Sequence, residues 1–591
     1  MKRISKLRLF WLLPIFASPL LLSATLFADA GDPPARVARL SFIKGAVSLQ
    51  PAGVSDWSQA SLNYPLSSGD RIYTDQESLA ELEVGSAAVR ASAATDLTVA
   101  SLDDQFMQLG LGQGTIRLRV YNLPTGDSIE VDTPNGALTI LLLGDYRVET
   151  FPNGSATLVI VTNGRLEVSG GGAPQWVESG QAAKLTGNGP IQVSFVSPPD
   201  PDAFDQWCWD RDSRLISSSS TVYVNPDTPG YEDLDSSGVW DEQTPLGPVW
   251  YPAGIPVGWV PYRFGRWVWV VPWGWTWVER EPWGFAPFHY GRWVLIGARW
   301  GWVPGPVAVF PCFAPALVVF LGGPQFSPGL AGGVQAWFPL GPDEPFFPWY
   351  HSSGAYLRRV NAAGVRDASI ITKTTNVSDF NSIHFVNKGA ATTVVSTAAF
   401  RSGLRIDRQV IRVGPEQLAK AEVIPHPATN PTARALGGGR PVTSPPRITT
   451  RPTISATGET LPPVPGGALQ PGQPPMAAQN APTGRGMPGG ITAGGAIASG
   501  PPRNPPRLIT RSPLPPPSVP FSVRQRALEA HPGRPLEPQQ EQNLRAGKPA
   551  GPMQDREFPP HPVQPAPAAH AEPAPRPAPA PAPQPSAAPR H

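Results

Sequence analysis

The sequence has little of what most enzymes and metal-binding proteins need. Its 591 residues include only two cysteines and eight histidines, and charged residues make up 16%. The three histidines before residue 400 are His289, His351 and His384, and no HExxH or paired-cysteine spacing accompanies them. No Gly-x-Ser-x-Gly elbow, P-loop or dinucleotide fingerprint is present. We therefore expect a protein that is not an enzyme and that carries neither a metal nor a cofactor.

The two cysteines, Cys208 and Cys312, leave two alternatives open. In an oxidising compartment they can pair in a disulfide that closes a long loop. They can equally be two free buried thiols, because the sequence does not fix the Cα separation that a disulfide requires. Neither cysteine lies in a recognisable nucleophile motif.

The acidic residues offer two weak candidate sites. Glu279 and Glu281 flank Arg280 between two aromatic repeats, and glycoside hydrolysis would require both carboxylates to face one cleft. Their spacing favours a solvated turn instead. The loop 233–238 has the spacing of half a calcium-binding EF loop, but Thr244 occupies the position that needs a bidentate glutamate. We interpret it as an acidic turn without metal.

Charge is also unevenly distributed. Residues 31–430 carry 27 basic and 37 acidic side chains, whereas residues 431–591 carry 16 basic and 7 acidic ones. An acidic body argues against nucleic acid as a partner, because nucleic-acid binding requires a positive surface.

The N-terminus has the pattern of an export signal. Basic residues between Lys2 and Arg8 precede an apolar run from Leu9 to Phe27, and the small residues of Ala28–Ala30 offer a cleavage site. We predict a signal peptide over residues 1–30, cleaved before Gly31, with an uncleaved membrane anchor as the alternative. The later apolar stretch 306–321 is interrupted by prolines, so we expect no transmembrane segment in the mature chain. The predicted location is the periplasm or the cell surface.

Residues 36–196 have the pattern of an all-β domain. The dipeptides Asn135-Gly136, Asn153-Gly154 and Asn163-Gly164 favour tight hairpin turns, because such turns need positive φ at their central positions. Apolar and polar residues alternate in Arg117–Val120, which predicts one apolar face and one wet face.

The same region resembles the FecR domain. The resemblance rests on five short motifs in the family's order: Phe42–Val47, Leu66–Thr74, Val131–Pro134, Val161–Val168 and Ser179–Gln181. Leu143-Gly-Asp-Tyr146 replaces the family's usual Gly-Thr-x-Phe strand. The resemblance implies an extracytoplasmic β-domain that meets another protein or the envelope. No cytoplasmic segment precedes the predicted export signal, so the family's action on a sigma factor is not expected to carry over.

Tryptophan dominates the next region, predicted as a second domain over residues 205–420. The segments Gly258–Trp267 and Gly284–Trp293 repeat at an offset of 26, and 12 of the 19 tryptophans lie between Trp240 and Trp302. Glycine and proline between aromatic strands predict one β-hairpin per repeat, stacked into a sheet or solenoid. The region resembles a tryptophan-rich domain of unknown function that commonly follows FecR domains in exported bacterial proteins.

These indoles have two interpretations. Tryptophans are most often buried, so the first is that they form the core of a small repeat domain. The second is that Trp269, Trp275, Trp277 and Trp302 form an aromatic face that stacks on sugars or cations.

Residues 425–591 are rich in proline, alanine and glycine, and we predict a disordered tail because they offer little apolar surface to bury. One amphipathic island, Val523–Ala530, predicts a transient helix. The predicted fold class is thus mainly β, with a FecR-like domain, a hairpin-repeat domain and a disordered tail.

For function, we expect a non-enzymatic binding or scaffold protein that contacts an envelope protein or a cell-wall polysaccharide. A signal-sensing regulator of the FecR type and a glycan-active envelope enzyme are the alternatives. The sequence leaves the oligomeric state open.

Overall fold

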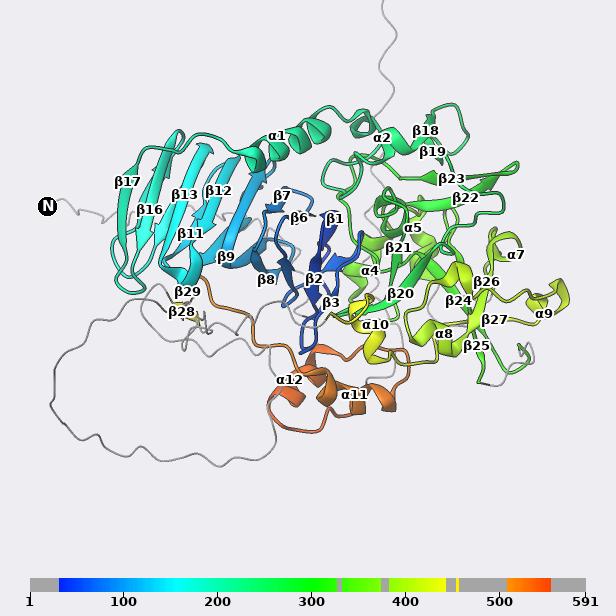
Figure 1. Cartoon of the computed structure of the whole chain (residues 1–591). Helices are drawn as coiled ribbons and strands as arrows, with labels where there is room; N and C mark the ends of the chain where they lie inside the picture. The colour runs from blue at the N-terminus through cyan, green and yellow to red at the C-terminus, as the bar shows by residue number, and fades with distance from the viewer. Residues whose placement is uncertain (1–30, 327–331, 374–381, 443–452, 456–507, 554–591) are drawn as a thin grey trace, which may run out of the picture.

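The structure is a computed structural model that describes residues 31–326, 332–373, 382–442, 453–455 and 508–553 (Figure 1). Within these residues the chain is mainly β, as the sequence predicts. Two bodies lie side by side, a β-domain that ends at residue 196 and an aromatic domain that follows it. The predicted signal peptide, residues 1–30, lies outside the described residues.

The β-domain consists of seventeen strands and one 3-10 turn. They are β1 (Ala38–Lys44), β2 (Val47–Gln50), β3 (Ser58–Gln59), β4 (Pro65–Leu66), β5 (Arg71–Thr74), β6 (Leu79–Glu83), β7 (Ala87–Ala91), β8 (Asp96–Leu102), β9 (Phe106–Val120), β10 (Ser128–Thr133), β11 (Gly136–Ile140), β12 (Gly144–Thr150), η1 (Pro152–Gly154), β13 (Ala156–Asn163), β14 (Arg165–Ser169), β15 (Gln175–Glu178), β16 (Gln181–Thr186) and β17 (Gln192–Val196).

These strands form two layers that share β9. The first half of β9 pairs with β8 and β10, and the second half pairs with β7 and β12. One layer then continues through β13 and β16 to β17, and the other continues through β11 and β14 to β15. Gly114 lies where β9 changes layers, with φ of +87°, and a Cβ there would stand 2.5 Å from the Cα of Thr95. Glycine is therefore required at this switch.

Two of the three predicted hairpins are present. Asn153 and Gly154 adopt φ of 61° and 63° between β12 and β13, as a tight turn of this kind needs. Strands β10 and β11 pair from Thr133 opposite Gly136, so their turn is centred on Pro134 and Asn135 rather than on Asn135 and Gly136. The prediction at Asn163-Gly164 is wrong, because β13 and β14 lie in different layers: β13 pairs with β12 and β16, and β14 pairs with β11 and β15. Apolar side chains from both layers form the core between them.

The polar face of one layer is covered rather than wet. Helix α1 (Ala203–Ile216) follows the β-domain and runs along it toward the aromatic domain (Figure 1). Its Asp205 forms an ion pair with Arg117, and its Asp212 pairs with Arg90 at 2.6 Å. Arg117 is only 3% exposed. The sequence expectation of a wet face at Arg117–Val120 is wrong, because alternation shows which face is polar but not which helix covers it.

The aromatic domain combines short strands with short helices. Its elements are η2 (Ser219–Val222), α2 (Leu234–Ser237), β18 (Gly238–Asp241), β19 (Val249–Pro252), β20 (Gly265–Val270), β21 (Gly274–Glu279), α3 (Ala286–His289), β22 (Arg292–Ile296), β23 (Arg299–Val303), β24 (Val318–Gly322), β25 (Val334–Pro339), α4 (Gly354–Asn361), α5 (Ala368–Lys373), α7 (Lys388–Ala391), β26 (Thr393–Ser396), α8 (Thr397–Arg401), η3 (Ile406–Arg408), α9 (Pro415–Ala419), β27 (Glu422–Ile424) and α10 (Ala433–Gly437).

Each 26-residue repeat forms one hairpin. Strands β20 and β21 place Trp267 opposite Trp277, and β22 and β23 place Trp293 opposite Trp302. The hairpins do not stack into one sheet or solenoid. Hairpin β22–β23 joins β18 and β19, whereas β20–β21 pairs with no other strand among the described residues. A third sheet has the order β26–β25–β24–β27.

Part of the predicted disordered tail is folded in the structure. Residues 425–442 and 508–553 are described, and the second stretch contains β29 (Leu508–Thr510), α11 (Phe521–Ala530) and α12 (Pro538–Arg545). Strand β29 pairs in parallel with β28 (Thr453–Ser455). The sequence prediction fails for these residues because it weighs only their own composition. Their stability comes from surface that the two domains offer, such as the carbonyl of Gly53, which accepts a hydrogen bond from the Phe521 N–H at 2.9 Å.

Candidate functional site

The four tryptophans predicted to form an aromatic face are buried. Trp275, Trp277 and Trp302 have no exposed surface, and Trp269 has almost none. Trp269 and Trp275 pack edge to face, with ring centroids 5.4 Å apart and planes at 86°. Two of these indoles donate their N–H to a carbonyl inside the protein. The Trp275 indole donates to the Thr429 carbonyl at 3.0 Å, and the Trp302 indole donates to the Tyr290 carbonyl at 2.8 Å.

This burial agrees with the core interpretation and contradicts a ligand groove lined by Trp275, Trp277 and Trp302. A stacking platform must offer a ring face to its ligand. Here other rings cover those faces, and Trp267 alone packs against five other aromatic side chains. Trp269 also lines a cavity of about 340 Å³, and Trp302 lines a much smaller one of about 30 Å³.

Glu279 and Glu281 do not form a catalytic pair. The Glu279 carboxylate is buried, and it accepts hydrogen bonds from the Trp277 indole and the Arg280 backbone N–H, both at 3.0 Å. Burial raises the pKa of Glu279 to about 7. Glu281 instead pairs with Arg280 at 2.8 Å near the surface. The expectation of a solvated turn is wrong for Glu279, which serves as an internal acceptor.

The cysteines are free and lie in separate buried environments. Cys208 is on α1, and burial raises the pKa of its thiol, which faces Arg90 and Arg117 of the β-domain. Burial raises the pKa of Cys312 to about 12, beside Arg359. The disulfide that the sequence left open is therefore not formed in this structure, and both thiols remain protonated at neutral pH.

His289 is a structural residue rather than a surface residue. It is fully buried, its Nδ1 lies 2.7 Å from the Ala314 carbonyl oxygen, and its ring stacks on Phe313 with centroids 4.7 Å apart. Burial lowers the pKa of His289 to about 3, so the ring stays neutral. In the part of the chain that the structure describes, no group of three or more His, Cys, Asp or Glu side chains could hold a metal ion.

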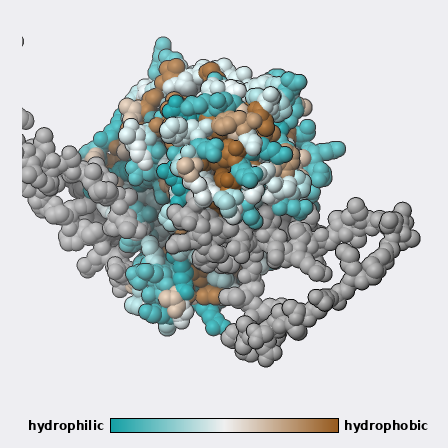
Figure 2. All heavy atoms as spheres, turned by 90° about the vertical axis from the view of Figure 1, so that its left-hand side faces the viewer, coloured by the Kyte–Doolittle hydropathy of each residue, from teal (hydrophilic) through white to brown (hydrophobic). Residues whose placement is uncertain are grey.

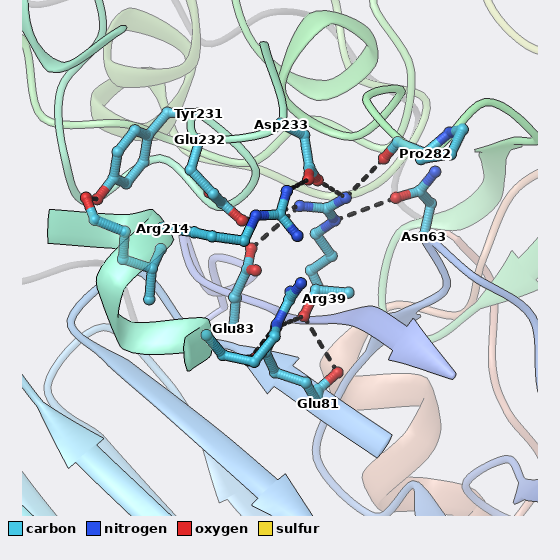
Figure 3. A network of polar contacts seen from close by, with 12 residues as sticks. Arg39, Asn63, Glu81, Glu83, Arg214, Tyr231, Glu232, Asp233 and Pro282 are labelled. Atoms are coloured by element: carbon cyan, nitrogen blue, oxygen red, sulfur yellow. Dashed lines mark hydrogen bonds and ion pairs between the residues drawn. The ribbon is translucent and has the colours of Figure 1, made fainter. Parts of the chain in front are cut away.

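A buried polar network joins the two domains (Figure 3). Its centre is Arg39 on β1, which is 1% exposed. The guanidinium lies 3.1 Å from Glu83 of its own domain and 2.5 Å from Asp233 of the aromatic domain, and it donates to the Pro282 carbonyl at 2.7 Å. Asn63 strengthens the junction, since its amide donates to the Glu281 carbonyl at 2.8 Å.

The network explains the acidic loop 233–238. Asp233 accepts from Arg39 and also lies 3.2 Å from Arg214 of α1. Asp235 accepts from the backbone N–H groups of Ser219 and Ser220, each at 3.0 Å. The loop carboxylates thus bind cations and N–H groups of the protein itself.

Two carboxyl groups of this network, Glu83 and Glu232, share the guanidinium of Arg39 as a nearby cation. Glu232 is fully buried, and its nearest cation, Arg39, is 3.9 Å away. Burial, followed by the charges of Glu83 and Asp233, raises the pKa of Glu232 well above its ordinary value. Burial thus favours the protonated form of Glu232, which reduces its repulsion from Glu83 and Asp233.

The most exposed apolar side chains of the β-domain lie at its far end. Strands β15 and β17 are the edge strands there, and each pairs with a single described strand. Trp176 on β15 is 58% exposed, and Phe195 on β17 is 54% exposed. Figure 2 views this end of the molecule and shows hydrophobic residues gathered near its centre. We call the exposed apolar side chains of these two edge strands, Trp176, Phe195 and Val196, the open end.

The sequence reasoning missed the open end. Trp176 lies outside the tryptophan repeats, in a four-residue strand with Gln175, Val177 and Glu178, and no motif marks it. A usable signal existed in the absence of charge: no residue from Gly187 to Pro199 is charged, although edge strands usually carry charges that prevent pairing.

Comparison with known proteins adds a family but no activity. Residues 231–344 match a family of unknown function, DUF6600, so the match falls within the aromatic domain. No curated protein matches the chain. The FecR resemblance of residues 36–196 stays a prediction.

Two crystal structures of a candidate anti-sigma factor from Parabacteroides distasonis are similar to part of the chain. Both are 15% identical over 22% of this chain and 60% of theirs, with TM-scores of 0.19 and 0.20. This chain thus matches less than two thirds of their length, and scores this low carry no argument about function. No helix within the described ranges is long and apolar enough to cross a membrane.

Proposed function

We propose that this protein is an exported, non-enzymatic binding protein of the cell envelope, and that its partner adds a strand to β17 at the open end. The observation that carries the proposal is the combination of an unpaired edge with exposed aromatic side chains. Soluble proteins seldom leave such groups together on the surface unless something binds there.

The edge is suited to a short added strand. Strand β17 covers only five residues, and Pro190 and Pro198 stand on either side of it. Proline cannot donate a ladder hydrogen bond, so pairing is confined to the segment between the two prolines. Peptides that add to a sheet edge gain affinity from main-chain hydrogen bonds and specificity from alternate side chains. Phe195 and Trp176 supply apolar contacts for those side chains.

Chemistry favours a protein partner over a polysaccharide. A sugar-binding platform would use exposed, parallel ring faces, and the tryptophans expected to supply them are buried in the aromatic domain. The FecR resemblance supports the same choice, because it implies a β-domain that meets another protein. A non-catalytic role is supported by Glu279, whose carboxylate is bonded within the core.

The test is a selection of random seven-residue peptides displayed on phage against the mature chain. We expect enriched peptides with apolar residues at alternate positions. Ser194→Lys places a charge on the exposed strand β17 and should weaken their binding at least 10-fold, a factor that corresponds to about 1.4 kcal/mol. Ser236→Lys, which adds the same charge at an exposed position on α2, is the matched control and should bind normally.

Three results would contradict the proposal. The first is that the selected peptides bind the Ser194→Lys variant as tightly as the parent. The second is a stable dimer that Ser194→Lys dissociates, since the strand would then pair with a second copy. The third is retention on peptidoglycan that is independent of β17, which would make a glycan the partner.

Export is tested separately. The mature chain should begin at Gly31 when protein from the envelope fraction is sequenced from its N-terminus. An intact Met1 on membrane-retained protein would exclude cleavage.

A further inference from the structure

A cavity of about 340 Å³ lies where four parts of the chain meet. The segment 31–34, strand β8 of the β-domain, residues of the aromatic domain around Trp269, and the C-terminal segment 514–545 all contribute to its wall. The volume is in the range of small-molecule binding pockets. None of the open-end residues lines it, so the cavity is separate from the proposed partner surface.

The wall is mainly apolar and rigid. Trp269 and Tyr350 provide aromatic surface, and Pro515, Pro516 and Pro517 form one side. Proline has no backbone N–H and a fixed φ, so these residues offer few donors and lose little entropy when a ligand binds. Such a wall selects for an apolar molecule.

The charges around the cavity already balance one another. Two cations, Arg524 and Arg545, face two anions, Asp32 and Glu541. Asp32 accepts hydrogen bonds from the N–H and the hydroxyl of Ser353. Glu541 lies 3.1 Å from Arg545 and 3.9 Å from Arg524. An ionised ligand would break this balance, which favours an uncharged one.

The Nε of Arg524 has no acceptor among the residues that the structure describes. Arg524 is 4% exposed, and its Nη2 donates to the Ala52 carbonyl at 2.9 Å. Because this Nε has almost no accessible surface, it lies behind the wall and does not face a molecule in the cavity. The nearby carboxylate of Asp70 accepts from the Ser67 and Ala52 N–H groups instead.

We propose that this cavity binds an uncharged, apolar small molecule. Because the C-terminal segment supplies both Arg524 and the proline wall, that segment builds the binding site. The site is independent of the strand partner proposed for β17.

The test is a titration of the mature chain with Nile red, an uncharged apolar dye with a carbonyl acceptor, monitored by fluorescence. We expect saturable binding at one site. Ala100→Phe, which fills the cavity from β8, should weaken binding at least 10-fold, and Thr98→Phe on the same face of the strand serves if that variant does not fold.

The controls separate this site from the open end. Phe195→Ser removes exposed apolar surface at the open end and should leave dye affinity unchanged. The anionic dye 1-anilinonaphthalene-8-sulfonate should bind at least 10-fold more weakly than Nile red. The proposal is overturned if wild-type protein shows no saturable binding, if both cavity-filling variants bind normally, if Phe195→Ser abolishes binding, or if the anionic dye binds as tightly.

Discussion

The cores of the two domains are filled by different kinds of side chain. The β-domain fills its interior with aliphatic side chains from regular strands, and its backbone hydrogen bonds are made by the ladders themselves. The aromatic domain has short strands joined by irregular segments, and its interior is filled by indoles. Several of these indoles donate to loop carbonyls, as Trp337 does to Tyr262 and Trp349 does to Trp273, each at 3.0 Å.

This difference explains why the repeat region needs so much tryptophan. An irregular backbone leaves carbonyl groups without ladder partners, and a buried unpaired carbonyl is destabilising. An indole fills a large volume and also carries one donor. In the aromatic domain, tryptophan therefore both fills the core and donates to buried carbonyl groups. In the β-domain, aliphatic side chains fill the core and the strand ladders pair the carbonyl groups.

The largest expected effect comes from the junction that joins the domains. Arg39→Ala leaves Glu83 and Asp233 without their central cation, and breaking a buried pair in this way costs about 3–5 kcal/mol. Urea unfolding measures the loss. The matched control is Arg165→Ala, which breaks a half-exposed pair with Glu178 and should cost at most about 1 kcal/mol. Equal losses would show that the junction contributes no more than a surface pair.

Buried carboxylates of the two domains should respond to pH in opposite directions. The pKa of Glu279 is raised to about 7 by burial, so the folded state holds its proton more tightly than the unfolded chain does. Its contribution to stability is present below about pH 4.5 and is lost as pH rises through about 7. Glu279→Gln should remove this loss, which is at most about 3 kcal/mol.

Glu81 of the β-domain supplies the contrast. Burial alone would raise its pKa, but hydrogen bonds and charges from Arg211 and Arg90 lower it to about 2. The stability that ionised Glu81 contributes is present above the ordinary pKa of a glutamate, and it is lost as pH falls through about 2. Glu81→Gln should therefore destabilise the protein at pH 7, whereas Glu279→Gln should not. Thermal melts of both variants at several pH values measure these changes in stability. The same pH dependence in both variants would contradict the opposite pKa shifts assigned to Glu81 and Glu279.

A smaller effect should separate two buried indoles of one hairpin. Trp275→Phe removes the donor to the Thr429 carbonyl, whereas the Trp267 N–H has no hydrogen-bond partner to lose. Both variants lose similar volume, so Trp275→Phe should be less stable than Trp267→Phe by about 1–2 kcal/mol. Chemical denaturation measures the difference. Equal stability of the two variants would show that the indole donors contribute little.

Sequence patterns predicted those features that depend on neighbours along the chain. The turn at Asn153-Gly154 and the hairpin ending in Trp277 follow from local rules, because φ preference and strand alternation are set within a few residues. The burial of the repeat tryptophans followed from their hydrophobicity. These predictions needed no knowledge of the partners.

Features that depend on distant segments were not predictable. The sequence pattern predicts a solvent-facing Arg117, but α1 covers this side chain in the structure. The hydroxyl of Ser512 donates to Glu130 at 2.6 Å, across a separation of 382 residues. Val523–Ala530 was predicted as a transient helix, and it forms α11 because Arg524 and Leu528 are buried against the body. The cavity could not be foreseen, since its wall brings together residues 31–34, β8, Trp269 and the C-terminal segment.

The central claim is that tryptophans in the aromatic domain hold the fold while the open end binds the partner. Trp277→Ala and Trp176→Ala test it directly in one chain, by thermal melt and by affinity for the selected peptides. We expect Trp277→Ala to lose about 3–5 kcal/mol of stability, and Trp176→Ala to melt like the parent but bind peptide at least 10-fold more weakly. An unchanged melting temperature for Trp277→Ala, or unchanged peptide binding by Trp176→Ala, would contradict the account.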